Sequence, residues 1–578
     1  TNGQLINLGA AADATPGTLG LSDAELDTVT AGTLRVGNAN SGAVTVSTAI
    51  NPANAPILKI TSGAGISGGA NLITNASIAL VAGGAGTINV TTAANNLAAT
   101  AANGAITISD ASPGGTLSVT TVDGVVGINS GGNAISLTET TGNVTVLQAV
   151  NAGAGTAAIT LDGANKLLTN AAVAITGTTG VTLTADQMAL TGGTVVATGA
   201  IATLVQKTNG QLINLGAAAD ATPGTLGLSS AELNTVTAGT LRVGNAFSGA
   251  LNVSAAIAPT GTTLLSLQSG GAVTQAVAGT ITETNLAVRS AGAITLNSAN
   301  DVTTFAAVST GASSALSFTD ANSFTVGTVD GLSGVKTNNG AIALTATAGN
   351  LTVSTTPATN GVDAGISTAT LRAGGDNNLL TIAASADVKG TGGVTLTADR
   401  MDLSGTVTAT GSTATLKADS AARYIDIGGA DSNLATGTTA TTGSLGLSNA
   451  ELRRIAATTV VVGDATGNTN TGAIGITSVI DLTGPTTATN LTLTNKVGGI
   501  SVGAGVKVAG ALTLTANADA GAVGAITDTT AGTLNDNVLA GNTVVLTAKT
   551  GIGVSHTGTF NPIAVQTTQP NGAGLTAT

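Results

Sequence analysis

Short segments in which apolar and polar residues alternate recur along the whole chain, and most of them follow a Gly or an Asn. Examples are GAVTVS at 42–47, GAITISD at 104–110, GAITLNS at 292–298 and GALTLTA at 510–516. Alternation with many β-branched residues predicts β-strands that turn Val, Ile and Leu to one side and Thr, Ser and Asn to the other. Several segments lie about 18 to 22 residues apart, which is the length of one coil of a parallel β-helix.

This spacing predicts an all-β fold, a parallel β-helix whose apolar side chains fill a narrow tube. Gly, Asn and Asp at the corners supply the positive φ angles that tight turns need. Stacked coils bury small and branched side chains against one another, so such a chain folds with few large residues. The composition fits, because the chain has 81 Gly, no Trp, one Tyr and five Phe, yet 42% of its residues are hydrophobic.

Longer phrases repeat as well, and they divide the chain. TNGQLINLGAAADATPGTLGLS begins at Thr1 and again at Thr208, GVTLTADQMALTGGTVVATG at Gly180 returns as GVTLTADRMDLSGTVTATG at Gly393, and RYIDIGGADSN at Arg423 restarts the unit. We expect repeat units at 1–207 and 208–422 and a partial unit at 423–578, stacked as one continuous solenoid with short helices and loops on its rim.

One charged phrase, GLSDAELDTVTAGTLRVG at 20–37, returns at 227–244 and more loosely at 446–463. A Ser followed three residues later by a Glu is a capping box, in which each side chain accepts a hydrogen bond from the other residue's backbone amide. We therefore expect a short helix in each copy, capped by Ser22 and Glu25, by Ser229 and Glu232, and by Ser448 and Glu451. The alternative is a repeated ligand site that uses Glu25 and Arg35, but Val461 stands in place of the arginine in the third copy.

Charge and composition exclude several classes of protein. The net charge is −12 and no cluster of Lys and Arg is present, which argues against binding to nucleic acid or to an anionic membrane. No apolar run approaches the ~20 residues that a membrane-spanning helix needs, so membrane insertion is not expected. The chain opens without the pattern of a signal peptide. The absence of Cys excludes disulfides and thiolate metal sites.

Motifs that resemble catalytic or metal sites are better explained as turns and strands. GISVG at 499–503 with His556 downstream matches a hydrolase elbow, and GAGISG at 63–68 matches a nucleotide-binding loop, but neither is followed by a helix pattern. Four aspartates near turns could bind Ca²⁺ weakly: Asp110, Asp123, Asp162 and Asp330. Otherwise we expect no catalytic residue, no cofactor and no metal.

Two further alternatives come from the fold and from the Thr content. A β-helix enzyme that cleaves polysaccharides would need clustered carboxylates and aromatic platforms, and this chain has scattered acids and one Tyr. Thr-x-Thr strings, which start at Thr182, Thr395, Thr492 and Thr513, would bind ice only as a ladder with one copy per coil. Because the strings lie far apart in the sequence, we expect ordinary outward-facing Thr instead.

The phrases TLTADxMxLxGTVxATG, INLG, GLSDAELDTVTAGTLRVG and GAVTVSTAI resemble the repeat region of filamentous-haemagglutinin-like bacterial exoproteins, which often use two-partner or autotransporter secretion. The resemblance covers most of the chain and implies a right-handed β-helix that forms an extended extracellular fibre at the bacterial surface. It implies roles in adhesion, aggregation or biofilm matrix, with glycans, cell surfaces or neighbouring copies as partners. Such exoproteins begin with a secretion domain, so this chain is expected to be an internal fragment.

The function expected from the sequence is therefore that of a non-catalytic rod. At ~20 residues and ~4.8 Å per coil, the chain would form a rod on the order of 140 Å long. Rows of Thr, Ser and Asn would offer a polar surface for weak multivalent contacts. The alternative is a subunit of a self-assembling filament, sheath or surface layer that is joined through open coil ends.

Overall fold

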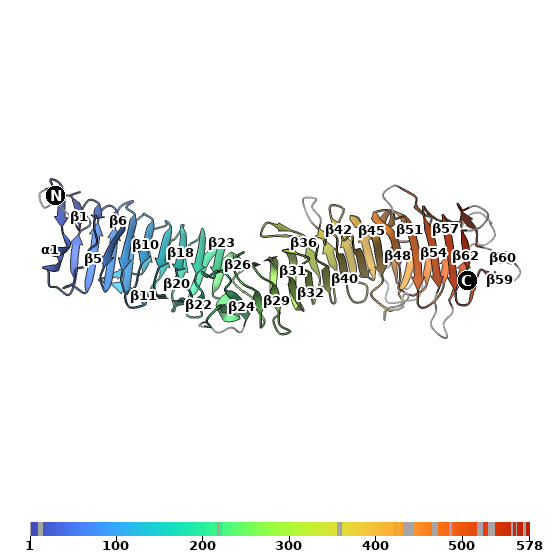
Figure 1. The fold of residues 1–578 in the computed structure, drawn as a ribbon, viewed down its shortest axis with the longest axis horizontal. Coiled ribbons are helices and arrows are strands. Elements are labelled where there is room, and N and C mark those ends of the chain that lie inside the picture. The colour runs from blue at the N-terminus through green and yellow to red at the C-terminus, as the bar shows by residue number, and fades with distance from the viewer. Residues whose placement is uncertain are drawn as a thin grey trace. The chain divides into compact units, whose positions relative to one another are not determined.

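The computed structural model describes residues 2–9, 15–216, 220, 222–354, 361–421, 423–431, 443–464, 472–484, 488–516, 524–529, 538–556, 559–561, 563–569 and 574–578. It divides into two compact units, Thr1–Glu283 and Thr284–Thr578. Within each unit, parallel strands stack coil upon coil (Figure 1). The predicted fold class, an all-β parallel β-helix, is confirmed.

A typical coil of the first unit contributes three strands, one to each face of the tube. The strands of one coil are β15 (Ile135–Glu139), β16 (Asn143–Val146) and β17 (Val150–Asn151), and those of the next are β18 (Thr156–Leu161), β19 (Leu167–Asn170) and β20 (Ala174–Thr176). Each strand pairs in parallel with its counterpart one coil away. Ile135 lies opposite Ala157, and Ala157 lies opposite Val181, so these coils take 22 and 24 residues.

The face that contains β15 continues through most of the first unit. Its other strands are β1 (Leu5–Leu8), β4 (Val44–Val46), β6 (Ile66–Thr74), β8 (Ile88–Ala93), β10 (Ile106–Asp110), β18, β21 (Gly180–Thr184), β23 (Thr194–Val205), β26 (Val236–Gly244) and β28 (Leu264–Ser269). The alternation predicted from the sequence holds here, because Ile108, Leu137, Ile159 and Leu183 point inward and are at most 1% exposed. Like residues therefore stack on like residues along the core.

The corresponding face of the second unit is built in the same way. Its strands are β31 (Ile294–Ala312), β32 (Leu316–Asp320), β37 (Ile342–Ala346), β40 (Thr368–Ala373), β43 (Gly393–Ala398), β45 (Thr406–Lys417), β48 (Ile455–Val462), β51 (Asn490–Asn495), β54 (Ala511–Ala516), β57 (Thr543–Ala548) and β62 (Leu575–Ala577). Phe305 and Phe318 stack inside this unit with their ring centroids 4.0 Å apart.

Two antiparallel hairpins interrupt the coils at the recurring phrase TVDG. The first joins β12 (Thr121–Val122) to β13 (Val125–Val126), and the second joins β34 (Thr328–Val329) to β35 (Leu332–Ser333). Asp123 and Gly124 both have positive φ, as a two-residue type I′ turn requires. The first hairpin lies on the outside of the tube, where Val122 and Val125 pack on Ala79 and Ala98.

Three short helices form at the charged phrases: α1 (Asp23–Asp27), α2 (Ser230–Leu233) and α3 (Asn449–Leu452). Each follows a strand, namely β2 (Thr18–Leu21), β25 (Thr225–Ser229) and β47 (Ser444–Leu447). No helix within the described ranges is long and apolar enough to cross a membrane.

Candidate functional site

The residues predicted as helix caps form a capping box in all three copies. Ser22 Oγ accepts a hydrogen bond from the Glu25 amide at 3.3 Å, and Glu25 Oε2 accepts one from the Ser22 amide at 2.8 Å. The other two copies have the same reciprocal pairs: Ser229 with Glu232, and Ser448 with Glu451. These residues therefore position the entry to a coil.

The alternative ligand site of Glu25 and Arg35 is not assembled. Arg35 Nε and Nη2 donate to the two carboxylate oxygens of Asp123 at 2.8 and 2.5 Å, and Lys59 Nζ lies 3.5 Å from the same carboxylate. Hydrogen bonds from Arg35 lower the pKa of Asp123 to about 2. Arg35 thus holds the first hairpin against the tube and is not directed at Glu25.

The four aspartates considered for Ca²⁺ lie apart and have protein partners. Asp123 pairs with Arg35, Asp330 pairs with Arg289, and Asp162 pairs with Lys207 at 2.8 Å. Asp110 is fully buried, and its carboxylate accepts hydrogen bonds from Thr92 Oγ1 and the Ala94 amide. In the described parts of the chain, no group of three or more His, Cys, Asp or Glu residues could hold a metal ion.

The motifs that resemble catalytic sites lie in the coil framework. Ser501 of the GISVG motif is in β52 (Ile500–Val502), which pairs in parallel on both sides, so the strand-turn-helix setting of a hydrolase elbow is not formed. His556 ends β59 (Val554–His556), which pairs with an antiparallel strand, and its side chain lies outside the described part of the structure. The 63–68 motif connects β5 (Ile57–Ser62) to β6.

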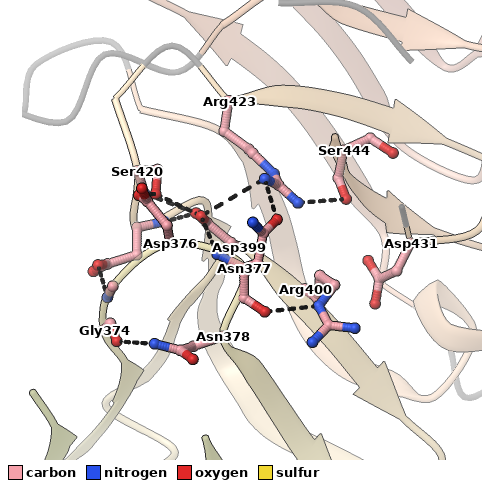
Figure 2. A network of polar contacts seen from close by, with 12 residues as sticks. Gly374, Asp376, Asn377, Asn378, Asp399, Arg400, Ser420, Arg423, Asp431 and Ser444 are labelled. Carbon is pink, nitrogen blue, oxygen red and sulfur yellow. Dashed lines mark hydrogen bonds and ion pairs between the residues drawn. The ribbon is translucent and has the colours of Figure 1, made fainter. Parts of the chain in front are cut away.

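A buried polar network in the second unit links successive coils (Figure 2). Asp399, the last residue of the recurring phrase TLTAD, accepts hydrogen bonds from the amides of Asn377 at 3.0 Å and Ser420 at 2.7 Å. Arg423 lies 3.8 Å away, and both side chains are fully buried. In the first unit, Asp186 accepts from the amides of Asn165 and Thr208. Each of these aspartates thus ties three successive coils together.

A depression beside this network is lined by Met401, Asp431 and Glu451, among other residues. Burial raises the pKa of Asp431 to about 7. Its carboxylate accepts hydrogen bonds from the amides of Met401 at 3.0 Å and Gly446 at 2.8 Å. Asp431 and Glu451 therefore satisfy backbone amides, which is a structural role.

A pair of hydroxyl-rich rows faces outward on the first unit. In the first row, successive coils place these residues in register: Asn7, Thr45, Ser67, Asn89, Thr107, Ser136, Ala158, Thr182 and Thr203. In the second row they place Thr91, Ser109, Thr138, Thr160 and Thr184. Neither row contains a charged residue over these coils. We call this surface the hydroxyl face.

The geometry of the hydroxyl face follows from the fold. Side chains of one row repeat at the spacing between strands, about 4.8 Å, and the two rows are two residues apart along each strand, about 6.7 Å. Side chains such as Thr107 and Thr182 are exposed, whereas Ser136 and Thr160 are half-buried between their neighbours. The face is therefore a regular array of mostly hydroxyl-bearing side chains.

The expectation that the Thr-x-Thr strings do not form a ladder is wrong in part. Thr492 lies opposite Thr513, and Thr494 lies opposite Thr515, on directly paired strands. In the first unit, strands that lack a Thr-x-Thr string have Ser, Ala or a single Thr at the outward positions in register with Thr182 and Thr184. Register, which the sequence does not display, brings these residues into rows.

Comparison with models of protein families, with curated proteins and with solved structures gives no match to this chain.

Proposed function

We propose that the chain is a non-catalytic structural and adhesive segment of a large bacterial surface or secreted protein. The hydroxyl face is the observation that carries this proposal. It offers a repeated, uncharged hydrogen-bonding surface over many coils, and the inward residues behind it are fully buried and hold it in place. The resemblance of the repeat phrases to filamentous-haemagglutinin-like exoproteins supports an extracellular location.

The adhesive mechanism follows from the repetition of the face. A single Thr hydroxyl exchanges a hydrogen bond with water for one with a ligand and gains little. Many equivalent hydroxyl groups on a rigid face engage a polymer together, so that weak contacts add up through a high effective concentration. Glycans suit this surface because they present hydroxyl groups along an extended, neutral chain.

Lysine substitutions on the hydroxyl face test this role. The variant Thr107→Lys/Thr182→Lys places two charges in the first row, while Ser118→Lys/Thr169→Lys places two on another face at outward positions of β11 (Thr116–Val119) and β19. We expect the full chain to be retained by an insoluble polysaccharide such as cellulose, chitin or mannan, and the first variant to bind roughly tenfold more weakly than the second. Equal binding by both variants, or no retention of the unsubstituted chain, would refute the proposal.

A second candidate function is assembly, in which the chain is a subunit of a filament, sheath or biofilm matrix. It is favoured by the edge formed by β2 and residues 28–37, where Leu19 and Val29 are 44% and 39% exposed. Unpaired strand edges readily add another strand. Sedimentation velocity of the full chain across concentrations tests this candidate, because assembly would increase the sedimentation coefficient with concentration.

A further inference from the structure

The three copies of the charged phrase differ in how well their surroundings cover them. Leu19 and Val29 in the first copy are 44% and 39% exposed. Their counterparts in the later copies are all fully buried: Leu226, Val236, Leu445 and Ile455. The whole first unit is not simply more exposed, because Leu5, which lies outside the charged phrase, and its counterpart Leu212 are both 49% exposed.

A single type of coil covers the later copies. Residues 180–205 and 393–417 share the phrase GVTLTAD, and each of these segments stacks directly against a copy of the charged phrase. β23 pairs with β26 over two stretches, 195–197 and 201–204, and β45 pairs with β48 in the same manner. In addition, β22 (Gln187–Ala189) and β44 (Arg400–Leu403) lie beside β25 and β47.

In the first copy this neighbour is missing within the described structure. The strand equivalent to β26 shortens to β3 (Leu34–Gly37), which pairs with β5 on one edge. β26 itself spans nine residues. Residues 29–33 of the first copy thus lack the strand conformation that their counterparts adopt against β23.

Hydrogen bonds to the preceding coil also differ between the first copy and the later copies. Glu232 Oε1 accepts a hydrogen bond from the Leu190 amide at 2.9 Å, and Glu451 Oε1 accepts one from the Leu403 amide at 3.2 Å. Glu25 Oε1 has no hydrogen-bond partner among the described residues, although Oε2 is engaged by Ser22. The Val195 amide donates to the carbonyl of Thr235, whose counterpart in the first copy is Thr28.

We propose that this edge, formed by Leu19, Leu21, Glu25 and residues 28–37, is a docking surface for one further β-helix coil with the sequence pattern of residues 180–207. The chain itself shows this coil on the equivalent surface twice. The docked coil adds parallel backbone hydrogen bonds to residues 29–37, covers the exposed apolar side chains and donates an amide to Glu25 Oε1. The proposal is independent of the hydroxyl face and of assembly between copies of the chain.

A fusion tests the proposal, because residues 208–216 are identical to residues 1–9. Residues 180–207 are placed directly before Thr1 of the full chain, which recreates the junction at 207–208. Hydrogen exchange is then followed at 29–37, with 236–244 of the same molecule as the internal reference. A matched control fusion carries Val195→Asp in the added coil, at the position that pairs with the edge.

In the unfused chain at low concentration, amides at 29–37 should exchange faster than those at 236–244 by roughly 100-fold or more. The fusion should slow exchange at 29–37 to near the reference, and the control fusion should leave it fast. Unchanged exchange in the fusion would overturn the proposal, as would equal protection in the control. Protection at 29–37 that rises with concentration in the unfused chain would also overturn it, because the far end of a second copy would then be the occupant. Sedimentation of the unfused chain reports on assembly separately from this result.

Discussion

Replacing the buried Asp110 by Asn should change how the stability of the first unit depends on pH. Asp110 ends β10 and points inward beside Glu139, which lies opposite it on β15. Burial, together with Glu139, raises the pKa of Asp110 to about 8. Asn keeps an oxygen that can accept from the Ala94 amide, which donates to Asp110 Oδ1 at 3.0 Å, but it cannot ionise.

The magnitude follows from proton linkage. The folded protein keeps a proton on Asp110 at pH values where the unfolded chain, with a pKa near 3.8, has lost it. The stabilisation is therefore complete below pH 3.8 and is lost as the pH rises toward 8. Each pH unit in this window lowers the free energy of unfolding by about 1.4 kcal/mol, so the loss between pH 4 and pH 7 is about 4 kcal/mol.

Urea unfolding of the full chain, followed by circular dichroism at pH 4, 5, 6 and 7, measures this effect. The difference in unfolding free energy, Asp110→Asn minus the unsubstituted chain, should increase by about 4 kcal/mol from pH 4 to pH 7. For Asp320→Asn in the second unit the increase should stop near pH 6, because burial raises the pKa of Asp320 to about 6. Thr182→Ala removes no titrating group and should give a flat difference. A flat or falling difference for Asp110→Asn would refute the reasoning.

Three other substitutions test the packing and the caps by the same unfolding assay. Leu183→Ala removes a fully buried core side chain and should cost about 2 to 5 kcal/mol. Arg423→Met leaves the buried Asp399 without its ion pair and should cost about 3 to 5 kcal/mol, whereas Arg423→Met combined with Asp399→Asn should recover part of this loss. Ser229→Ala removes a cap and should cost about 1 kcal/mol, which hydrogen exchange at 230–236 would localise.

Features set by local sequence could be predicted, since the interactions that define them lie within a few residues. Strand alternation marks the inward residues such as Ile108 and Leu137, and the capping boxes need only a Ser and a Glu three residues apart. The Asp-Gly pair at 123–124 is also a local signal for a type I′ hairpin.

Features that depend on register between coils could not be predicted in the same way. The rows of the hydroxyl face join residues about 20 apart, and Asn89, Ser136 and Ala158 do not look alike in the sequence. Asp110 was interpreted as a turn residue, but a signal for its burial was present. Asp110 lies two residues after Ile108 and four after Ile106 on the same strand. Because side chains alternate along a strand, its side chain points inward as theirs do.

The stacking also constrains which residues an outward row can contain. Like charges at ~4.8 Å repel by about 0.9 kcal/mol in water, and the repulsion would recur at every coil. Charged residues in the outward rows of the second unit instead occur with partners outside their row, as when Arg372 binds Asp419 and Lys417 binds Asp464. The low charge of the chain thus follows partly from the fold and is weak evidence for adhesion by itself.

The stronger evidence lies in the contrast between neighbouring faces of the first unit. On the face of β3 and β5, the outward row contains Arg35, Lys59 and the two alanines that the first hairpin covers. On the hydroxyl face, eight of the nine positions from Asn7 to Thr203 in the first row are Thr, Ser or Asn, the other is Ala158, and the next residue in register is Arg242. A requirement for neutrality alone would admit Ala, Val or Gln equally. Outward Thr is common on β-strands in any case, so the polar row is a surface on which the proposed adhesion can be tested, and the lysine variants at Thr107 and Thr182 are that test.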